Sequence, residues 1–109
     1  MKLETHLHTC ESSPCGKLAA AEMARRYAQA GYAAAVITDH INRNTTSAES
    51  FLAGFKAFRK AAKSLGLTAL LGAEVRLLDF GPHDFLIYGP REKDIPQLLD
   101  ILRSDPPVE

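Results

Sequence analysis

The sequence of 109 residues lacks an excess of charge of either sign. Lys and Arg together number 13, and Asp and Glu also number 13, so the formal net charge is zero. Sequence-independent binding to nucleic acid, or to an anionic membrane surface, needs a surplus of cations that this composition does not supply. We therefore expect no nucleic acid among the partners of the protein.

Long apolar runs are absent as well. No segment approaches the roughly 20 apolar residues that span a bilayer, and the N-terminal MKLETHLH has no basic region followed by an apolar one. These absences predict a cytoplasmic protein without a membrane partner. The two cysteines, Cys10 and Cys15, lie in one short loop, which favours reduced thiols that pack in the loop, with metal binding as the alternative, over a disulfide framework.

Apolar residues make up 46% and charged residues 24% of the chain, which indicates one globular domain over residues 1–109. Strand-like and helix-like patterns alternate along it. Strands are expected at 2–8, 33–38, 67–78 and 83–89, and helices at 17–30, between Thr46 and Gly66, and at 94–103. The short DFGP link leaves no room for a crossover helix, so the last two strands should form an antiparallel hairpin. The order βαβαββα predicts an α/β fold in which helices cover a mostly parallel sheet.

The second expected helix shows the strongest helical pattern. Thr46 and Glu49 have the spacing of a capping box at its start. One face is apolar at helical spacing, and its phenylalanines are predicted to be core residues rather than a binding surface. This face comprises Phe51, Phe55, Phe58, Ala62 and Leu65.

Four residues capable of binding a metal fall near the ends of expected strands. His6 and His8 are two apart, so a strand would present both imidazoles on one side. His40 follows the run AAVITD, and Glu74 closes the run ALLGA. Each could instead be a solvated strand end, but parallel strands bring their carboxyl ends to one rim, where these side chains would meet. Imidazole and carboxylate ligands together suit divalent Zn, Mn or Fe rather than Ca.

The segments ETHLHT, AGYAAAVITDHIN, GAEV and HDFLIYG resemble, in order and spacing, successive motifs of the PHP (polymerase and histidinol phosphatase) superfamily. The similarity extends over nearly the whole chain up to Gly89. It implies the N-terminal part of a distorted (β/α)7 barrel whose site holds up to three divalent metal ions. By this resemblance His6 and His8 would bind one metal, Glu74 would bridge two, and His40 would serve a third position.

The same resemblance implies a further ligand just before the last expected strand. Asp84 fits the spacing of that ligand and His83 fits its residue type, so both remain candidates. A plain hairpin is expected to lift both away from Glu74.

Two departures from the family pattern accompany the resemblance. Where many members carry an aspartate after HxHT, this chain has SSPCG, so that Ser13 replaces a strong ligand and Glu11 or Cys15 would have to reach in. The later family ligands, a histidine and a D-x-H, have no counterpart after Gly89. The chain is therefore expected to be a fragment, to complete its barrel with another chain, or to be a shortened domain. An exposed sheet edge would favour a homo-oligomer.

The resemblance and the candidate ligands together predict a metal-dependent phosphoesterase that hydrolyses a small phosphorylated substrate. Asp39 would orient a metal ligand or accept a proton, and Arg43 or Arg76 would bind the phosphate. The alternative is a non-catalytic metal-binding or interaction module with an incomplete site. A third possibility, an accessory domain of a DNA polymerase, is disfavoured by the neutral charge.

Overall fold

The computed structural model of the protein describes residues 1–14, 16–76 and 84–104. In chain order its elements are β1 (Lys2–Glu4), α1 (Ala20–Gln29), β2 (Tyr32–Ile37), β3 (His40–Ile41), α2 (Ala48–Lys63), β4 (Thr68–Arg76), β5 (Asp84–Tyr88), a 3-10 turn (Glu92–Asp94) and α3 (Ile95–Ser104). None of the helices in this part of the chain is long and apolar enough to cross a membrane.

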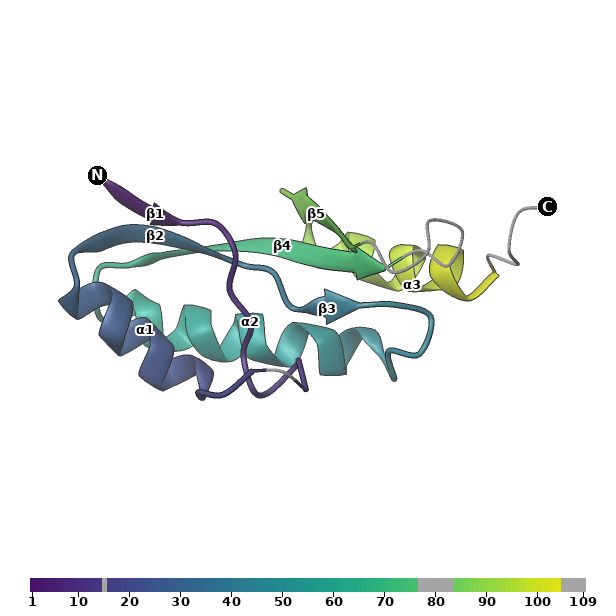
Figure 1. Ribbon diagram of the computed structural model, residues 1–109, viewed down its shortest axis with the longest axis horizontal. Helices are drawn as coiled ribbons and strands as arrows, with labels where there is room; N and C mark the ends of the chain where they lie inside the picture. The colour runs from purple at the N-terminus through teal and green to yellow at the C-terminus, as the bar shows by residue number, and fades with distance from the viewer. Residues whose placement is uncertain (15, 77–83, 105–109) are drawn as a thin grey trace.

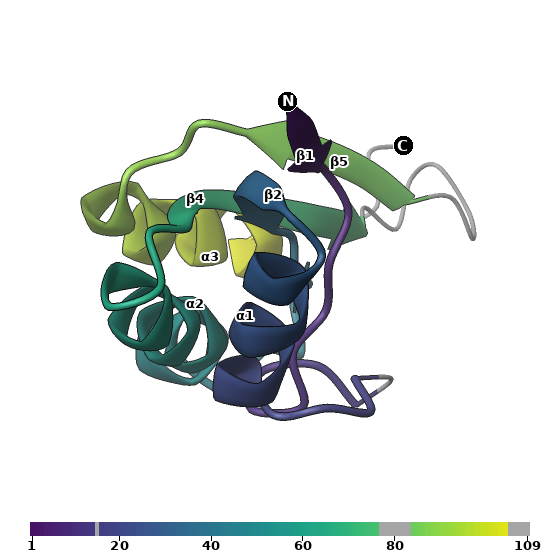
Figure 2. The same cartoon turned by 90° about the vertical axis from the view of Figure 1, so that its left-hand side faces the viewer.

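The strands form one curved sheet with helices packed against a single face. β1, β2 and β4 are parallel neighbours, and β5 pairs with β4 in the antiparallel direction. Helices α1 and α2 lie side by side beneath this sheet (Figure 1), and the end-on view in Figure 2 shows the same layering. The predicted α/β fold with a mostly parallel sheet and an antiparallel hairpin is therefore confirmed.

The core lies between the sheet and α2, where the aromatic face of that helix is buried as predicted. Phe51, Phe55 and Phe58 are at most 5% exposed. Leu65 is different because α2 ends at Lys63, and its side chain is 41% exposed. The helix stops two residues before Leu65, so this residue does not continue the buried face.

The helix begins one residue later than the sequence pattern suggested. The Ser47 hydroxyl accepts a hydrogen bond from the backbone N–H of Ser50 (3.0 Å), and the Ser50 hydroxyl accepts one from the N–H of Ser47 (3.1 Å). This pair, not Thr46 and Glu49, forms the capping box, because a serine at the third helical position can replace the usual glutamate when its hydroxyl folds back.

The first strand is shorter than expected, although its alternation continues. β1 ends at Glu4, so His6 and His8 lie beyond it rather than within it. Leu7 nevertheless pairs with Thr38: its N–H donates to the Thr38 hydroxyl (2.9 Å), and its carbonyl accepts from the Thr38 N–H (2.8 Å). Leu7 is buried in the core, and the histidines on either side of it therefore point to the opposite face.

A strand that the sequence did not predict continues β2 after a two-residue break. His40 in β3 pairs with Glu74 in the same register in which Ile37 in β2 pairs with Leu71. The carbonyl of Asp39 accepts a hydrogen bond from the N–H of Glu74 (2.9 Å), so the break does not separate the chain from β4. As a result His40 lies directly beside Glu74 on the sheet.

The Asp39 carboxylate ties the loop after β1 to this break. It accepts hydrogen bonds from the Thr9 N–H (2.6 Å), the Thr9 hydroxyl (2.8 Å) and the Ser13 hydroxyl (2.7 Å), and Asp39 is only 1% exposed. Burial raises the pKa of the Asp39 carboxyl above its usual range, and the three donors oppose that rise. The Ser13 hydroxyl also accepts a hydrogen bond from the N–H of His40 (3.0 Å), which fixes the backbone of that histidine. We call Asp39, Thr9 and Ser13, joined by these hydrogen bonds, the knot.

The sheet curls strongly enough to bring its two edges together. β1 and β5 are separated by β2 and β4, which in a flat sheet would place them about 14 Å apart, three times the usual strand spacing. The Tyr88 hydroxyl on β5 nevertheless donates to the carbonyl of Thr5, just beyond β1, at 3.0 Å. We call the face opposite α1 and α2 the concave face; it carries Glu74 and Tyr88.

We predict that Gly54→Ala destabilises the protein, although alanine favours helices. A Cβ at Gly54 in α2 would overlap the Thr9 hydroxyl and lie 2.8 Å from Asp39 Oδ2. In an unobstructed helix the same change stabilises by about 1 kcal/mol, whereas overpacking costs about 1–3 kcal/mol.

Urea unfolding measures the difference. In a Thr9→Ala background, which removes the overlapping hydroxyl, the additional cost of Gly54→Ala should become smaller. A Gly54→Ala protein that is as stable as the parent would contradict this account of the knot.

Candidate metal centre

Three imidazoles converge on the carboxylate of Glu74. His6 Nε2 lies 2.5 Å and His8 Nε2 lies 2.9 Å from Glu74 Oε1, and His40 Nδ1 lies 3.3 Å from Glu74 Oε2. Glu74 itself is buried. Burying a carboxylate is costly unless it is paired. The partners of Glu74 here are imidazole nitrogens, which can also bind a metal.

The local fold explains why these four side chains meet. His6 and His8 point to the concave face because Leu7 between them is buried. His40 reaches the same face through its register with Glu74 in β4. The rings pack on one another: the centroids of His8 and His40 are 4.3 Å apart, and those of His6 and His8 are 5.0 Å apart. The predicted convergence of these residues is thus present in the structure.

The cluster is open to solvent on one side. The side chain of His6 is 50% exposed, whereas those of His8 and His40 are 19% and 29% exposed. A ligand from solution would therefore approach past His6, while the other imidazoles line the inner part of the site.

Asp84 lies in the cluster. The expectation that a hairpin would lift it away from Glu74 is therefore wrong. Asp84 pairs with Arg76 across the β4–β5 ladder, two residues beyond Glu74 and on the same face. Two groups of possible ligand atoms result, His6–His8–Glu74 and His40–Glu74–Asp84, each within 4.8 Å of one another. His83, the other candidate for this position, lies outside the described residues.

The donor atoms fit a divalent ion. Ligands about 2.1 Å from a tetrahedral zinc lie about 3.4 Å from one another, and the three nitrogen–oxygen distances at Glu74 are 2.5, 2.9 and 3.3 Å. A small outward movement of the imidazoles would accommodate such an ion. The mixture of imidazole and carboxylate donors suits Zn, Mn or Fe, and Glu74 is the donor that the two groups share.

An ion pair keeps Asp84 negatively charged. Arg76 Nε lies 2.8 Å from Asp84 Oδ1, and Arg76 Nη2 lies 3.3 Å from Oδ2. This guanidinium lowers the pKa of the Asp84 carboxyl below its usual range. An ionised carboxylate is the form that binds a metal.

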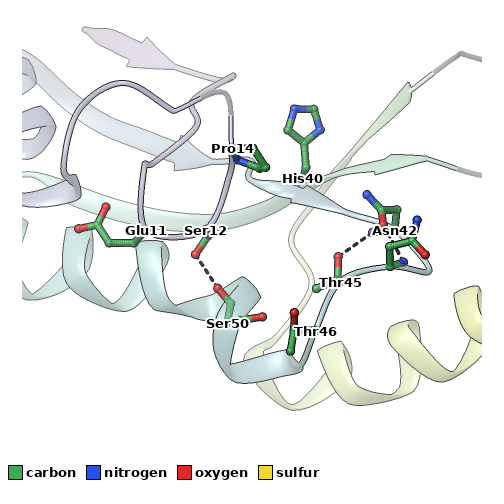
Figure 3. Close-up of a pocket in the computed structure, with 9 residues that line it drawn as sticks. Glu11, Ser12, Pro14, His40, Asn42, Thr45, Thr46 and Ser50 are labelled. Atoms are coloured by element: carbon green, nitrogen blue, oxygen red, sulfur yellow. Dashed lines mark hydrogen bonds between the residues drawn. The ribbon is translucent and has the colours of Figure 1, made fainter.

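A hollow opens beside His40 (Figure 3). Its volume is about 350 Å³, and Figure 3 shows Glu11, Ser12 and Ser50 on one side of it and the loop from Asn42 to Thr46 on the other. The remaining lining residues are Pro14 and His40. A second hollow of about 290 Å³ is lined by Pro14, His40, Asn42 and Arg76. His40 therefore borders both the candidate metal ligands and the space that a small molecule could occupy.

The two arginines proposed for phosphate binding differ in position. Arg76 borders the second hollow and contacts Asp84. Arg43 is exposed in the loop between β3 and α2 and lines neither of the two hollows. The structure thus places Arg76, and not Arg43, next to the cluster.

Several other candidate residues lie away from the cluster. Asp39 is held by Thr9 and Ser13 and is not part of either group of possible ligands. Glu11 does not reach the cluster, because both of its carboxylate oxygens accept from the N–H of Ala20 at the start of α1 (3.0 and 3.1 Å). Cys10 is a free, exposed thiol, and Cys15 lies outside the described residues.

Sequence reasoning did not identify the residues that hold the ligands in place. Thr9 and Ser13 fix Asp39, and Glu4 and Tyr88 contact the backbone next to His6. Thr9 immediately follows the HLH motif, and Glu4 precedes His6 by two residues, so their closeness to the histidines in the sequence could have indicated a supporting role. For Ser13 and Tyr88 the sequence offered no such indication, because their partners are distant in the sequence.

The family model of the PHP domain matches residues 4–102. No curated protein sequence matches significantly. Among solved structures, the chain resembles an amidohydrolase from Chromobacterium violaceum with bound sulfate and no metal, with 26% sequence identity and a TM-score of 0.58. The similarity covers 79% of this chain but only 26% of that one. Because the family model extends over nearly the whole sequence, the chain belongs to the PHP domain family.

Proposed function

We propose that this chain carries the metal site of a phosphoesterase that hydrolyses a small phosphate ester. The observation that carries the proposal is the pair of overlapping donor groups that share Glu74. A carboxylate shared between two donor sets is suited to bridge two divalent ions, and paired ions about 3.5–4 Å apart are common in enzymes that cleave phosphate esters.

The residues of the chain would each contribute a distinct part of the site. Divalent ions, when bound there, supply Lewis acidity toward the phosphoryl oxygens and the attacking water. His6 and His8 would hold one ion, His40 and Asp84 the other, with Glu74 between them. The knot at Asp39 would keep the backbone of His40 in place, which makes Asp39 a positioning residue in this proposal.

The two hollows suggest where the substrate would lie. Arg76 borders the smaller hollow next to His40, where its guanidinium could bind a phosphoryl oxygen. The larger hollow is lined by hydroxyl and amide side chains together with Glu11, Pro14 and His40, and no lysine or arginine is among its lining residues. It would therefore receive the alcohol portion of the ester rather than a second phosphate.

The structural neighbour bears on the kind of bond that is hydrolysed. It was solved with bound sulfate, which shares the tetrahedral shape and the negative charge of phosphate. It is also described as an amidohydrolase, so hydrolysis of a carbon–nitrogen bond is the second candidate activity. The chain spans about a quarter of the length of that protein.

We predict that the protein binds two divalent ions and loses stability when they are removed. An ion that binds the folded protein alone stabilises it by about 2.7 kcal/mol when its concentration is 100 times its dissociation constant. Elemental analysis gives the metal content, and thermal unfolding with and without EDTA gives the change in stability. One weakly bound ion, without turnover of any ester, would favour a non-catalytic metal-binding module instead.

His8→Ala should abolish most of the hydrolysis of a chromogenic phosphate ester in the presence of Mn or Zn. Loss of a residue that only supports a metal ligand typically costs 10–100-fold, so loss of a ligand should lower kcat/KM by more than about 100-fold. A chromogenic amide is assayed in parallel. Hydrolysis of the amide and not of the phosphate ester would replace the phosphoesterase proposal by the second candidate.

The two arginines test the placement of the phosphoryl group, provided that the metal content of each variant is measured as well, because Arg76 also pairs with Asp84. Arg76→Ala should raise KM for the phosphate ester about tenfold or more, because a charge-assisted hydrogen bond to the phosphoryl group contributes about 1.5–3 kcal/mol. Arg43→Ala removes an equivalent charge from a loop that lines neither hollow and should leave KM within about twofold. Equal effects of the two substitutions would argue against the placement of the phosphoryl group near Arg76.

A further inference from the structure

The peptide bond between Thr5 and His6 lies in a gap between two paired regions of backbone. β1 ends at Glu4, and the next backbone pairing is made by Leu7 with Thr38. His6 is also the most exposed of the three imidazoles at Glu74. A side chain in such a position needs other contacts to hold its direction, since neither a sheet ladder nor close packing supplies them.

Side chains bond both polar atoms of this peptide. On one side, the carbonyl of Thr5 accepts from the Tyr88 hydroxyl at 3.0 Å. On the other side, the N–H of His6 donates to Glu4 Oε2 at 3.2 Å, and the same oxygen accepts from the N–H of Thr5 at 3.1 Å. The peptide plane is thereby held from two directions, by a strand at the far edge of the sheet and by the last residue of β1.

Glu4 is in turn held by a residue of α1. The Tyr27 hydroxyl donates to Glu4 Oε1 at 3.0 Å, and the Tyr27 ring packs edge-on against Tyr32 with the centroids 4.8 Å apart. Burial, followed by the proximity of Glu4, raises the pKa of Tyr27 to about 12. The hydroxyl therefore keeps its proton at neutral pH and remains a donor to Glu4.

We infer that Glu4, Tyr27 and Tyr88 are positioning residues that fix the Thr5–His6 peptide and thereby aim the imidazole of His6 at Glu74. We call these three residues the peptide clamp. The inference deepens the proposed function, since the group that the clamp aims belongs to the proposed metal site, but the contacts of the clamp do not depend on a bound ion.

The clamp acts on only one of the two donor groups. His6–His8–Glu74 includes the residue that the clamp holds. In the other group, His40 and Asp84 are both held by ladder pairing with β4. Loosening the clamp should therefore weaken one metal position and leave the second unchanged, which a general loss of stability would not do.

The first test needs no metal. Tyr88→Phe and Tyr27→Phe each delete one hydroxyl of the clamp, and both should speed hydrogen exchange of the His6 amide by up to about tenfold, the equivalent of one hydrogen bond. Tyr32→Phe is the matched control, because Tyr32 contacts Tyr27 and Lys2 through its ring and its hydroxyl has no hydrogen bond with any other described residue. Identical exchange of the His6 amide in all three variants and the parent would overturn the inference.

Glu4 offers a graded version of the same test. Glu4→Ala removes both acceptor oxygens, whereas Glu4→Gln keeps one oxygen that can still accept from the backbone. We expect the fastest exchange of the His6 amide in Glu4→Ala and partial protection in Glu4→Gln. Equally fast exchange of the His6 amide in Glu4→Ala and Glu4→Gln would overturn the role of Glu4 in the clamp, because the retained side-chain oxygen would then give no protection.

The second test is a two-site titration with Zn or Mn by calorimetry. Tyr88→Phe should weaken one site about tenfold, in the range found for residues that support metal ligands, and leave the other site as in the parent and in Tyr32→Phe. Equal weakening of both sites, or of neither, would overturn the inference. If the parent binds no metal while the tyrosine variants still lose protection at His6, the clamp stands and the proposed phosphoesterase site fails.

Discussion

The site depends on one buried carboxylate. Glu74 lies on the concave face, where it contacts imidazoles from the segment after β1 and from β3. Without these partners, or an ion in their midst, the burial of its charge would be strongly unfavourable. The curvature of the sheet, the break between β2 and β3 and the pairing of β5 with β4 all serve to bring donors toward this residue. The fold and the candidate site therefore cannot be considered separately.

A second carboxylate has a different task. Asp39 receives three hydrogen bonds from Thr9 and Ser13 and does not face the cluster. It joins the loop after His8 to the backbone before His40, and α2 presses against the same point through Gly54. Two acidic residues that look alike in the sequence are thus separated by their surroundings: Glu74 faces groups that can bind metal, and Asp39 faces donors that only the protein supplies.

Periodicity and motif spacing were enough to anticipate the helices, the parallel strands, the hairpin and the meeting of His6, His8, His40 and Glu74. They did not reveal β3, because a two-residue strand has no period of its own and exists only through its register with β4. They also misjudged Asp84, whose approach to Glu74 follows from the side of β4 on which the hairpin closes. The hydrogen bonds from Tyr27 to Glu4 and from Tyr88 to Thr5 could not be predicted either, because they join residues that are far apart in the chain.

The uninterrupted register across the break between β2 and β3 has a consequence for sequence change. Ile37 pairs with Leu71 and His40 with Glu74, so the number of residues between Ile37 and His40 decides which way the imidazole faces. Inserting or deleting a single residue there would turn His40 toward α2 and turn Ile41 outward, because side chains alternate along a strand. The length of this two-residue link therefore constrains the site independently of the contacts that Thr38 and Asp39 make.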